Sequence, residues 1–483
     1  MKLLDKVPFN RHFMAQKLNN KSIISILNSY SFFFRKFGEK TAKKGTERPN
    51  NKEYISILGE KYRSDSYSNI TPTILKAVEK KLHFQVSHPL GILRQIIESQ
   101  FDTTNYEIFN EFSPVVSTVK NFDWLKFPID HPDRKSTNTY YVNENHVLRT
   151  HTSAHQIDAF RRMKKKGFLI TADVYRRDEI DKNHYPVFHQ MEGVRVWEKT
   201  EGRSLVEEIE ILESNISYLG IVIENSTFPF YSQQNPLQKN HQKDEIEAIS
   251  RHLIKTVEKI IGYIYEISRP LHDQLNKDTP LKIRWIESYF PFTSPSWELE
   301  IFWEGKWIEI CGCGIINHEL LKIADIPNRI GWAFGLGLER IAMIFFKIPD
   351  IRLFWSNDPR FLKQFSPGKI SIFQPYSKYP PCYKDIAFWV NKKEISDKSS
   401  LSTIKRRKFC ENDFMEIVRN VGGILIEEVK LIDQYTHLET KRKSLCYRIN
   451  YRSMDRSLTD KEVNKLQERL RSRIAEELDI ELR

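Results

Sequence analysis

The C-terminal part of the chain, from residue 379 onward, shows six consecutive stretches of hydrophobic patterning. Four are apolar or alternating stretches typical of strands, and the other two repeat apolar residues at helical spacing. The order is strand, helix, strand, strand, helix, strand over about 105 residues, which is the split βαβ arrangement of a ferredoxin-like domain. The predicted strands are Cys382–Val390, Ile424–Tyr435, Ser444–Arg452 and Ile480–Leu482, and the predicted helices are Asn412–Asn420 and Asp460–Leu478.

The middle of the chain carries hairpin-like pairs of strands and long amphipathic helices. The most informative pair is Phe168–Asp178 and Pro186–Trp197, which flank the polar loop Glu179–Tyr185 as in a long antiparallel hairpin. Acidic amphipathic helices are predicted at Ser204–Leu219 and Lys243–Ser268. This pattern predicts an α+β fold in which helices flank an antiparallel sheet.

One face of that hairpin carries chemistry suited to a charged ligand. Side chains two apart share a face of a strand, so Arg176 and Asp178 point one way, and Phe188, Gln190 and Glu192 share a face of the second strand. The guanidinium suits a phosphate, the ring suits a base, and a carboxylate suits an ammonium group. From residue types alone, a surface hairpin laced with salt bridges explains the pattern equally well.

A second stretch, 329–340, reads as a glycine-bearing strand that feeds directly into an apolar helix. Gly335 and Gly337 remove side chains where a ligand could lie on the backbone, and Arg340 falls in the first helical turn. As a dinucleotide-binding loop the pattern is incomplete, because the third glycine and the surrounding βαβ unit are missing. An arginine that clamps a phosphate chain fits better.

Composition narrows the class of protein. The chain has 483 residues and a formal net charge of +12, with 75 lysines and arginines against 63 acidic residues, so a polyanionic partner is indicated. The sequence has no run of about eighteen apolar residues, which excludes a membrane-spanning segment. Five cysteines without paired CxxC spacing indicate neither a disulfide framework nor a zinc ribbon.

Residues 1–46 differ from the rest, with ten basic residues against two acids and an apolar face among Ser and Asn. This composition is typical of a mitochondrial transit peptide and differs from a secretory signal, whose apolar region is continuous. The alternative is a disordered basic tail that touches RNA nonspecifically.

Together these stretches resemble motifs 2 and 3 of a class II aminoacyl-tRNA synthetase, with Arg176 and Arg340 as the two arginines that mark the motifs. From about residue 65 to the C-terminus, the sequence is similar to the mitochondrial-type, single-chain phenylalanyl-tRNA synthetases. One departure from the general class is Arg176-Arg177-Asp178 where motif 2 usually reads Arg-x-Glu. The matching segments are 148–153, 174–178, 188–193, 290–293, 331–340, 348–355, 378–380 and 385–386.

The resemblance implies roles for individual residues. Phenylalanine's carboxylate attacks the α-phosphate of ATP; Arg176 stabilises the transition state and Arg340 holds the γ-phosphate end. Phe188 stacks on adenine, and Asp178 contacts the adenine amino group or a metal-bound water. Glu309 binds the Mg²⁺ that accompanies ATP. The implied amino-acid site comprises His151, Ser153, Gln190, Glu192, Phe290, Phe292 and Ala333.

No zinc is expected. His151 and His155 are four residues apart, a spacing that can place two ligands on one helical face, but no glutamate follows His151 to complete HExxH.

The resemblance also implies the domain organisation: a transit peptide at 1–46, a class II catalytic domain at 47–368, a linker at 369–377 and a ferredoxin-like anticodon-binding domain at 378–483. Basic runs on the last domain are expected to contact tRNA phosphates. These residues are Lys405, Arg406, Arg407, Lys408, Lys441, Arg442 and Lys443.

We therefore expect a phenylalanine–tRNA ligase of the mitochondrial matrix, working as a monomer on phenylalanine, ATP and mitochondrial tRNA(Phe). A noncatalytic synthetase-like RNA-binding protein is the first alternative, and a class II synthetase for another amino acid is the second. Against the first alternative, four polar residues that such a protein could lose are present: Arg176, Gln190, Glu192 and Arg340. Against the second, the aromatic slot is built from Phe290, Phe292 and Ala333.

Overall fold

The computed structural model describes residues 53–198, 202–216, 219–225, 230–239, 241–272, 279–375, 379–391 and 406–483. The predicted transit peptide, residues 1–46, lies outside these ranges, as do Lys405 and the last residues of the predicted linker. None of the helices within the described ranges is both long enough and apolar enough to cross a membrane.

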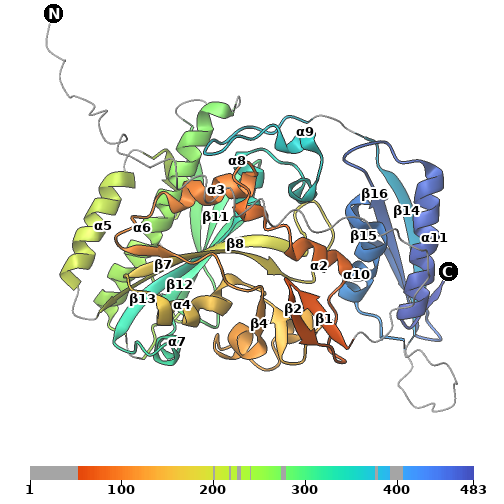
Figure 1. Ribbon diagram of the computed structural model, residues 1–483, viewed down its shortest axis with the longest axis horizontal. Helices are drawn as coiled ribbons and strands as arrows, with labels where there is room; N and C mark the ends of the chain where they lie inside the picture. The colour runs from red at the N-terminus through yellow and green to blue at the C-terminus, as the bar shows by residue number, and fades with distance from the viewer. Residues whose placement is uncertain are drawn as a thin grey trace, which may run out of the picture. The chain divides into compact units, whose positions relative to one another are not determined.

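An eight-stranded sheet organises residues 53–375, in the order β3-β7-β8-β13-β12-β11-β10-β9 (Figure 1). The inner strands are antiparallel, as predicted, but both edges differ: β3 is parallel to β7 and β9 is parallel to β10. The two edge strands are only three residues long. A long connection joins each of them to its parallel neighbour, as a parallel pair requires. The strands are β3 (Tyr106–Ile108), β7 (Gly167–Tyr175), β8 (Val187–Glu198), β9 (Ile221–Ile223), β10 (Leu281–Glu287), β11 (Thr293–Trp303), β12 (Lys306–Ile316) and β13 (Arg329–Gly337).

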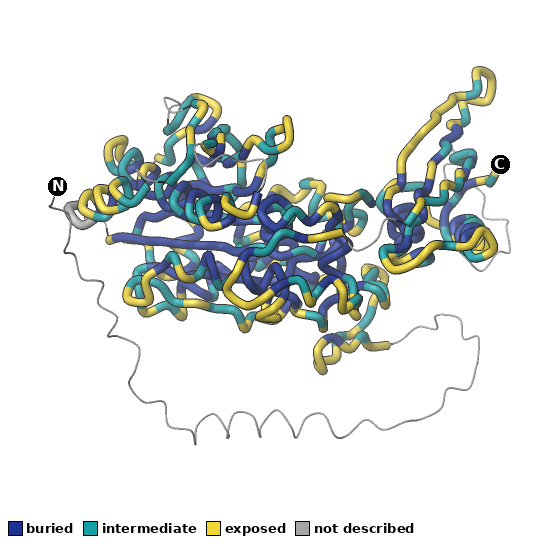
Figure 2. The backbone as a smooth tube through the Cα atoms, turned by 90° about the horizontal axis from the view of Figure 1, so that it is seen from above, coloured by how far each residue is buried: buried dark blue, intermediate teal, exposed yellow. Residues whose placement is uncertain are grey.

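Helices cover the two faces of this sheet unequally. One face packs against α3 (Pro89–Glu98), α6 (Lys243–Ser268) and α8 (Leu338–Phe345), and α5 (Gly202–Ile216) lies along α6. The other face meets the shorter α4 (Gln156–Arg162) and α7 (His318–Ile323), which cover only part of it. Figure 2 shows the central strands in dark blue, because side chains on both faces are shielded from solvent.

Smaller elements surround the sheet. Thr71 and Asp358 cap the N-termini of α2 (Pro72–Val78) and α9 (Pro359–Leu362) through their side-chain oxygens. A two-stranded sheet pairs β1 (Tyr54–Ile57) with β2 (Glu60–Arg63), and a three-stranded sheet has the order β4-β6-β5, with β4 (Val115–Ser117), β5 (Tyr141–Asn143) and β6 (His146–Leu148).

The alternation along β8 explains where the sheet is open. Val194 and Val196 lie in the core beneath α4 and α7. On the same face, Glu192, Gln190 and Phe188 lie two, four and six positions before Val194. The apolar half of that face is therefore covered, and the polar half faces the opening beyond α4.

The predicted first strand of the hairpin ends three residues earlier than expected, at Tyr175 and not at Asp178. Arg176 N still donates across the hairpin to Pro186 O, but Arg177 N donates to Asn138 O, outside the sheet. The chain therefore leaves the ladder after Arg176, and residues 177–185 form a loop.

The C-terminal residues form the predicted ferredoxin-like domain, with strand order β15-β16-β14-β17 and two helices on one face. Its observed bounds lie within a few residues of the prediction, and Thr459 closes a capping box at the start of α11. The elements are β14 (Cys382–Val390), α10 (Glu411–Gly422), β15 (Ile426–Thr436), β16 (Lys443–Tyr451), α11 (Asp460–Glu477) and β17 (Ile480–Leu482).

Candidate active site

A cavity of about 410 Å³ opens on the polar half of the large sheet, above β8, β12 and β13. It has an "aromatic end", lined by Phe127, His151, Phe290, Phe292 and Ala333, and an "arginine end", lined by Arg176, Asp178, Phe188, Glu309 and Arg340. Ser153 and Gln190 also line the cavity. The cavity thus brings together side chains that the sequence analysis selected from five separated segments: 151–153, 176–190, 290–292, 309 and 333–340.

Stacked rings form the wall of the aromatic end. Phe290 and Phe292 lie with centroids 5.9 Å apart. The ring of His151 lies 5.8 Å from that of Phe292 and 5.6 Å from that of Phe127, and these two rings are 6.0 Å apart. Burial lowers the pKa of His151 to about 3, so its imidazole is neutral at physiological pH. This end therefore offers apolar ring faces together with an uncharged polar ring.

The floor of the aromatic end is kept low by small residues. A Cβ on Gly312 would lie 2.7 Å from Cζ of Phe290, a separation that no real contact allows, so only glycine lets that ring lie against β12. Ala333 is buried on the neighbouring strand, where it pairs with Gly314. The depth of the space beneath the rings is therefore fixed by residues 312 and 333.

Glu192 lies deeper on β8 and is 1% exposed. Its Oε1 accepts a hydrogen bond from Gln156 Nε2 at 2.6 Å, and Gln190 Oε1 accepts one from Thr152 N at 3.3 Å. Burial raises the pKa of Glu192 to about 7, against smaller opposing effects of nearby hydrogen bonds. Such a carboxylate gains from a cationic partner, because an ammonium group would stabilise its charged form.

Arg176 anchors the arginine end. Its Nε donates to Thr150 O at 2.9 Å, and its guanidinium carbon lies 5.2 Å from the centroid of the Phe188 ring. Burial lowers the pKa of Arg176, while the charges of Asp178 and Glu309 oppose that shift. The guanidinium remains charged and is held by the backbone, and the ring beside it suits a nucleotide base.

Arg340 occupies the third position of α8, and its Nη1 donates to both the backbone oxygen and Oε2 of Glu309 at 3.1 Å. The two side chains are 41% and 45% exposed, so this ion pair is open to solvent and to exchange. Gly337 precedes α8 and has open space where a Cβ would stand. An extended polyanion has room to lie over the glycine and reach the guanidinium.

A buried side-chain pair links β8 to the start of α8, in addition to the backbone pairing of β8 with β13. His189, on the face of β8 opposite Gln190, contacts Glu339 Oε1 through Nδ1 at 2.6 Å and donates its backbone N–H to Oε2 at 2.8 Å. This pair ties the start of α8, and with it Arg340, to the strand that carries Phe188.

Two glutamates at the arginine end fit a divalent cation. Burial raises the pKa of Glu298 on β11, and the charge of Glu309 on β12 raises it further. Carboxylate oxygens are the ligands that Mg²⁺ prefers, and a cation between them would relieve their repulsion. Glu298 was not predicted from the sequence, because nothing in its strand distinguishes it from Glu300, which is half-buried and pairs with Arg284.

The histidine pair considered for zinc does not share one environment. His155 Nε2 contacts Arg149 Nη1 at 3.0 Å and its ring stacks on Phe112, whereas His151 lines the cavity. In the part of the chain that the structure describes, three potential metal-ligand atoms come within 4.8 Å of one another at Glu179, Asp181 and His184, on the loop after Arg176.

Two residues that the sequence analysis missed bind the chain just after Phe290 and Phe292 and so help to hold these rings in place. Asn235 Nδ2 donates to Ser296 O, and Asn235 Oδ1 accepts from Ser296 N, at 2.8 and 2.7 Å. Gln238 Nε2 donates to Ser294 O at 2.7 Å and Gln238 Oε1 accepts from His318 N at 2.8 Å. These amides lie in a polar loop some 60 residues away in the chain, so only the fold reveals their role.

The predicted tRNA-contacting residues that are described are exposed, except for the half-buried Arg442, and two of them are already paired. Arg407 bridges Asp413 and Glu477, and Arg442 pairs with Glu481. The exposed side chains of Arg406, Lys408, Lys441 and Lys443 remain available on the same domain.

Family models match most of the chain. Residues 75–250 and 246–365 match the model of the tRNA synthetases class II core domain (F), and residues 377–483 match the ferredoxin-fold anticodon binding domain. The first match contains both ends of the cavity, and the second contains the whole C-terminal domain.

Similar proteins are found across eukaryotes. A protein of Saccharomyces cerevisiae named phenylalanine–tRNA ligase, mitochondrial, is 47% identical over 457 residues, covering 89% of this chain and 95% of that protein. The chloroplastic/mitochondrial phenylalanine–tRNA ligase of Arabidopsis thaliana is 42% identical, covering 87% and 83%. The mitochondrial phenylalanine–tRNA ligase of Mus musculus is 39% identical, covering 88% of each chain.

Proposed function

The chain belongs to the phenylalanine–tRNA ligase family, and from this membership we propose how its cavity carries out the ligation. The enzyme activates phenylalanine with ATP and transfers it to the 3′ end of a tRNA. The observation that carries the assignment of residues is one cavity with an aromatic end sized by Gly312 and Ala333 and an arginine end holding Arg176 and Arg340.

In the first step a carboxylate oxygen of phenylalanine attacks the α-phosphorus of ATP, and the bond to the β-phosphate oxygen breaks to release diphosphate. Negative charge gathers on the α-phosphate oxygens in the transition state, and Arg176, already fixed by Thr150, stabilises it. Arg340 exchanges Glu309 for the γ-phosphate end of ATP, and Phe188 stacks on adenine. Asp178 meets the adenine amino group or a metal-bound water.

Mg²⁺ neutralises the phosphate charge when it is bound, and Glu309 with Glu298 would hold it. Burial and, to a smaller extent, the nearby charge of Glu309 raise the pKa of Glu298, and a cation between the two carboxylates would offset both effects.

The amino acid lies with its ring in the aromatic end and its ammonium toward Glu192. Phe290 and Phe292 contact the ring, Ala333 limits the space at its para position, and His151, Ser153 and Gln190 hold the polar end. In the second step a hydroxyl of the terminal tRNA ribose attacks the carbonyl carbon of the adenylate, and AMP leaves.

We assign the substrate as mitochondrial tRNA(Phe), the compartment as the mitochondrial matrix and the active form as a monomer. The names of the relatives support the organelle, and basic residues 1–46 support import into it. The domain division at 1–46, 47–368, 369–377 and 378–483 belongs to the same proposal, with Lys405–Lys408 and Lys441–Lys443 contacting the tRNA.

ATP–pyrophosphate exchange measured across the amino acids tests the proposal. Exchange should depend on phenylalanine and Mg²⁺. If none of the amino acids supports exchange, the noncatalytic RNA-binding alternative is favoured, and exchange that depends on a different amino acid would refute the substrate.

A further inference from the structure

The loop that follows Arg176 is bound by the C-terminal domain through its backbone. Asn412 Nδ2 donates to Arg177 O at 3.4 Å, and Val429 N donates to Ile180 O at 3.0 Å. Between them, Arg419 Nη2 donates to the backbone oxygens of residues 178 and 179 at 2.7 and 3.3 Å. Four consecutive carbonyls of the loop, residues 177–180, therefore accept hydrogen bonds from one domain.

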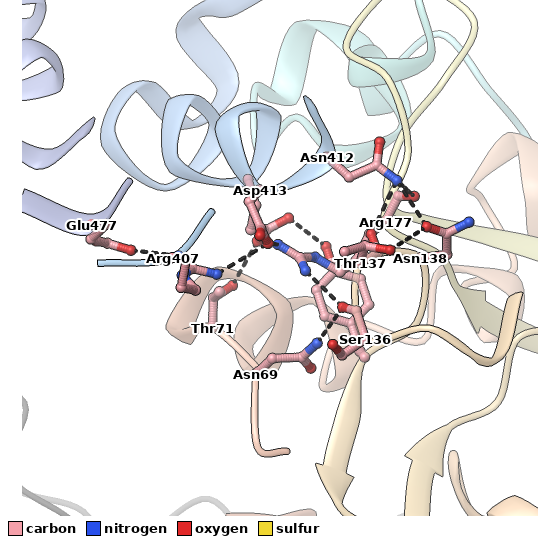
Figure 3. Close-up of polar contacts among 12 residues, drawn as sticks. Asn69, Thr71, Ser136, Thr137, Asn138, Arg177, Arg407, Asn412, Asp413 and Glu477 are labelled. Carbon is pink, nitrogen blue, oxygen red and sulfur yellow. Dashed lines mark hydrogen bonds and ion pairs between the residues drawn. The ribbon is translucent and has the colours of Figure 1, made fainter. Parts of the chain in front are cut away.

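Side chains strengthen the attachment, as Figure 3 shows. The guanidinium of Arg177 pairs with Asp413 at 2.9 Å, and Asp413 also pairs with Arg407 at 3.0 Å. Asn412 donates to Thr137 O at 3.0 Å as well. The start of α10 thus holds two chain segments of the large domain at once.

The loop also enters the hydrophobic core of the C-terminal domain. Ile180 is 7% exposed and belongs to the same buried cluster as Phe414, Val418 and Val429. Because β15 is an edge strand, the N–H of Val429 that reaches Ile180 O is one that its sheet leaves unpaired. The C-terminal domain therefore binds this loop both through the backbone of its edge strand and by burying Ile180 in its core.

The other side of the same loop lines the arginine end of the cavity. Asp178, Asn183, His184 and Tyr185 all face that space. A displacement of the loop would move these side chains relative to Arg176, which directly precedes the loop and is still hydrogen-bonded to Pro186 in the hairpin.

Arg419 is the best-anchored member of the attachment. It is 6% exposed, and its Nη1 pairs with Glu416 Oε2 at 2.7 Å. Glu416 Oε2 also accepts from Tyr140 Oη at 2.8 Å, so the guanidinium is fixed from both domains before it reaches the loop. A bound arginine presents two N–H groups in a rigid fork, which a lysine cannot reproduce.

We propose that the C-terminal domain positions the ATP-binding loop, with Arg419 as the positioning residue, and that it does so in the activation step, before any tRNA is bound. The proposal rests on the proposed function, because it assigns the loop to ATP. It gives a domain named for anticodon binding a second task in the chemistry of the first half-reaction.

The test uses the full chain in tRNA-free ATP–pyrophosphate exchange with Arg419→Lys. The lysine keeps a charge beside Glu416 but loses the fork to the carbonyls of residues 178 and 179. We expect the KM for ATP to rise about tenfold, equivalent to about 1.4 kcal/mol, with the KM for phenylalanine unchanged. The matched control is Arg473→Lys, an exposed arginine of α11 in the same domain that pairs with Glu477.

Asn412→Ala provides a second variant, since this half-buried side chain is removed without leaving a buried charge. It should raise the KM for ATP in the same direction by a smaller factor. Unchanged ATP kinetics in both variants, or an equal rise in the KM values for ATP and phenylalanine, would overturn the proposal. Wild-type exchange with phenylalanine in the same assay reports on the proposed function separately, and equilibrium binding of MgATP to the variants tests the loop without turnover.

Discussion

The two ends of the cavity are built from different materials. At the aromatic end, Gly312 and Ala333 lie on strands of the sheet and Phe290 and Phe292 lie in the turn between β10 and β11. The polar side chains of His151, at the start of a short 3₁₀ turn, and of Glu192, on β8, are buried there. At the arginine end, Arg176 directly follows a strand, Asp178 lies on a loop, and the side chain of Arg340 is 41% exposed.

This difference assigns recognition of the amino acid's shape to one end of the cavity and stabilisation of phosphate charge to the other. A rigid, dry wall discriminates shape, because a misfitting side chain must either leave space or displace packed rings. An open site with exchangeable charges accommodates a flexible polyphosphate and stabilises charge as it develops. Substitutions at the arginine end should therefore act mainly on turnover or on ATP, and those at the aromatic end on phenylalanine.

The largest expected effect is at the arginine end. Arg176→Ala should lower kcat for ATP–pyrophosphate exchange by about 10²–10³-fold, because a preorganised cation is lost where charge develops. Arg329→Ala, at the far end of β13 where it pairs with Glu198, should leave exchange near the wild-type rate. A loss confined to the KM for phenylalanine would break the division between the two ends.

At the aromatic end, Glu192→Gln should raise the KM for phenylalanine by about 100-fold, since an ammonium loses its charged partner. In the wild type the same KM should rise about tenfold per pH unit below about 7, because only the ionised carboxylate binds the ammonium and burial raises its pKa to about 7. The variant should lose this pH dependence, and Glu198→Gln on the same strand should retain it.

Although Glu192→Gln should weaken phenylalanine binding, it should stabilise the folded protein at high pH. A carboxyl group whose pKa is higher in the folded state binds more protons there, so the wild type loses stability as pH rises from about 4.5 to about 7. Glu192→Gln removes this loss and should raise Tm at pH 8 relative to the wild type. A lower Tm at pH 8 would show that the carboxylate is structural.

A smaller effect is expected from depth alone. Ala333→Gly should admit para-chlorophenylalanine and raise its kcat/KM about tenfold, because the removed methyl group opens the space beneath the ring. Ala172→Gly, a buried strand position on β7 outside the cavity lining, controls for the loss of a methyl group. Unchanged kinetics with para-chlorophenylalanine would refute the placement of residue 333.

The smallest expected effect concerns stability at the arginine end. Arg340→Gln should change the free energy of unfolding in urea by less than about 1 kcal/mol, since its ion pair with Glu309 is exposed. The same variant should raise the KM for ATP. A large loss of stability would show that the pair holds the fold and is not free to exchange for phosphate.

Sequence alone predicted the elements whose patterns are local and complete. Helix α6 has the predicted bounds Lys243–Ser268, and the C-terminal strands and helices follow the predicted order, because alternation and helical periodicity are uninterrupted there. The parallel edge strands were missed since three residues carry too little pattern to define a strand or its direction.

Only those site residues that lie in short, recognisable motifs could be selected from the sequence. Arg176, Arg340 and the paired phenylalanines carry rare combinations in short motifs, and the fold brings them to one cavity. Asn235 and Arg419 are ordinary polar residues in sequence, and their importance comes from backbone oxygens that lie 61 and 241 positions away. Only tertiary structure creates such contacts.

The glycine beneath Phe290 makes the two positions interdependent under mutation. A side chain at residue 312 is excluded only while the phenylalanine ring occupies that space, since Cζ is the atom a Cβ would meet at 2.7 Å. Gly312→Ala should therefore be harmful by itself and tolerated after Phe290 has been shortened, so the effects of the two changes are not additive. A lineage or a library that alters the amino-acid pocket has to change the ring first, and the order of substitutions limits which specificities can be reached.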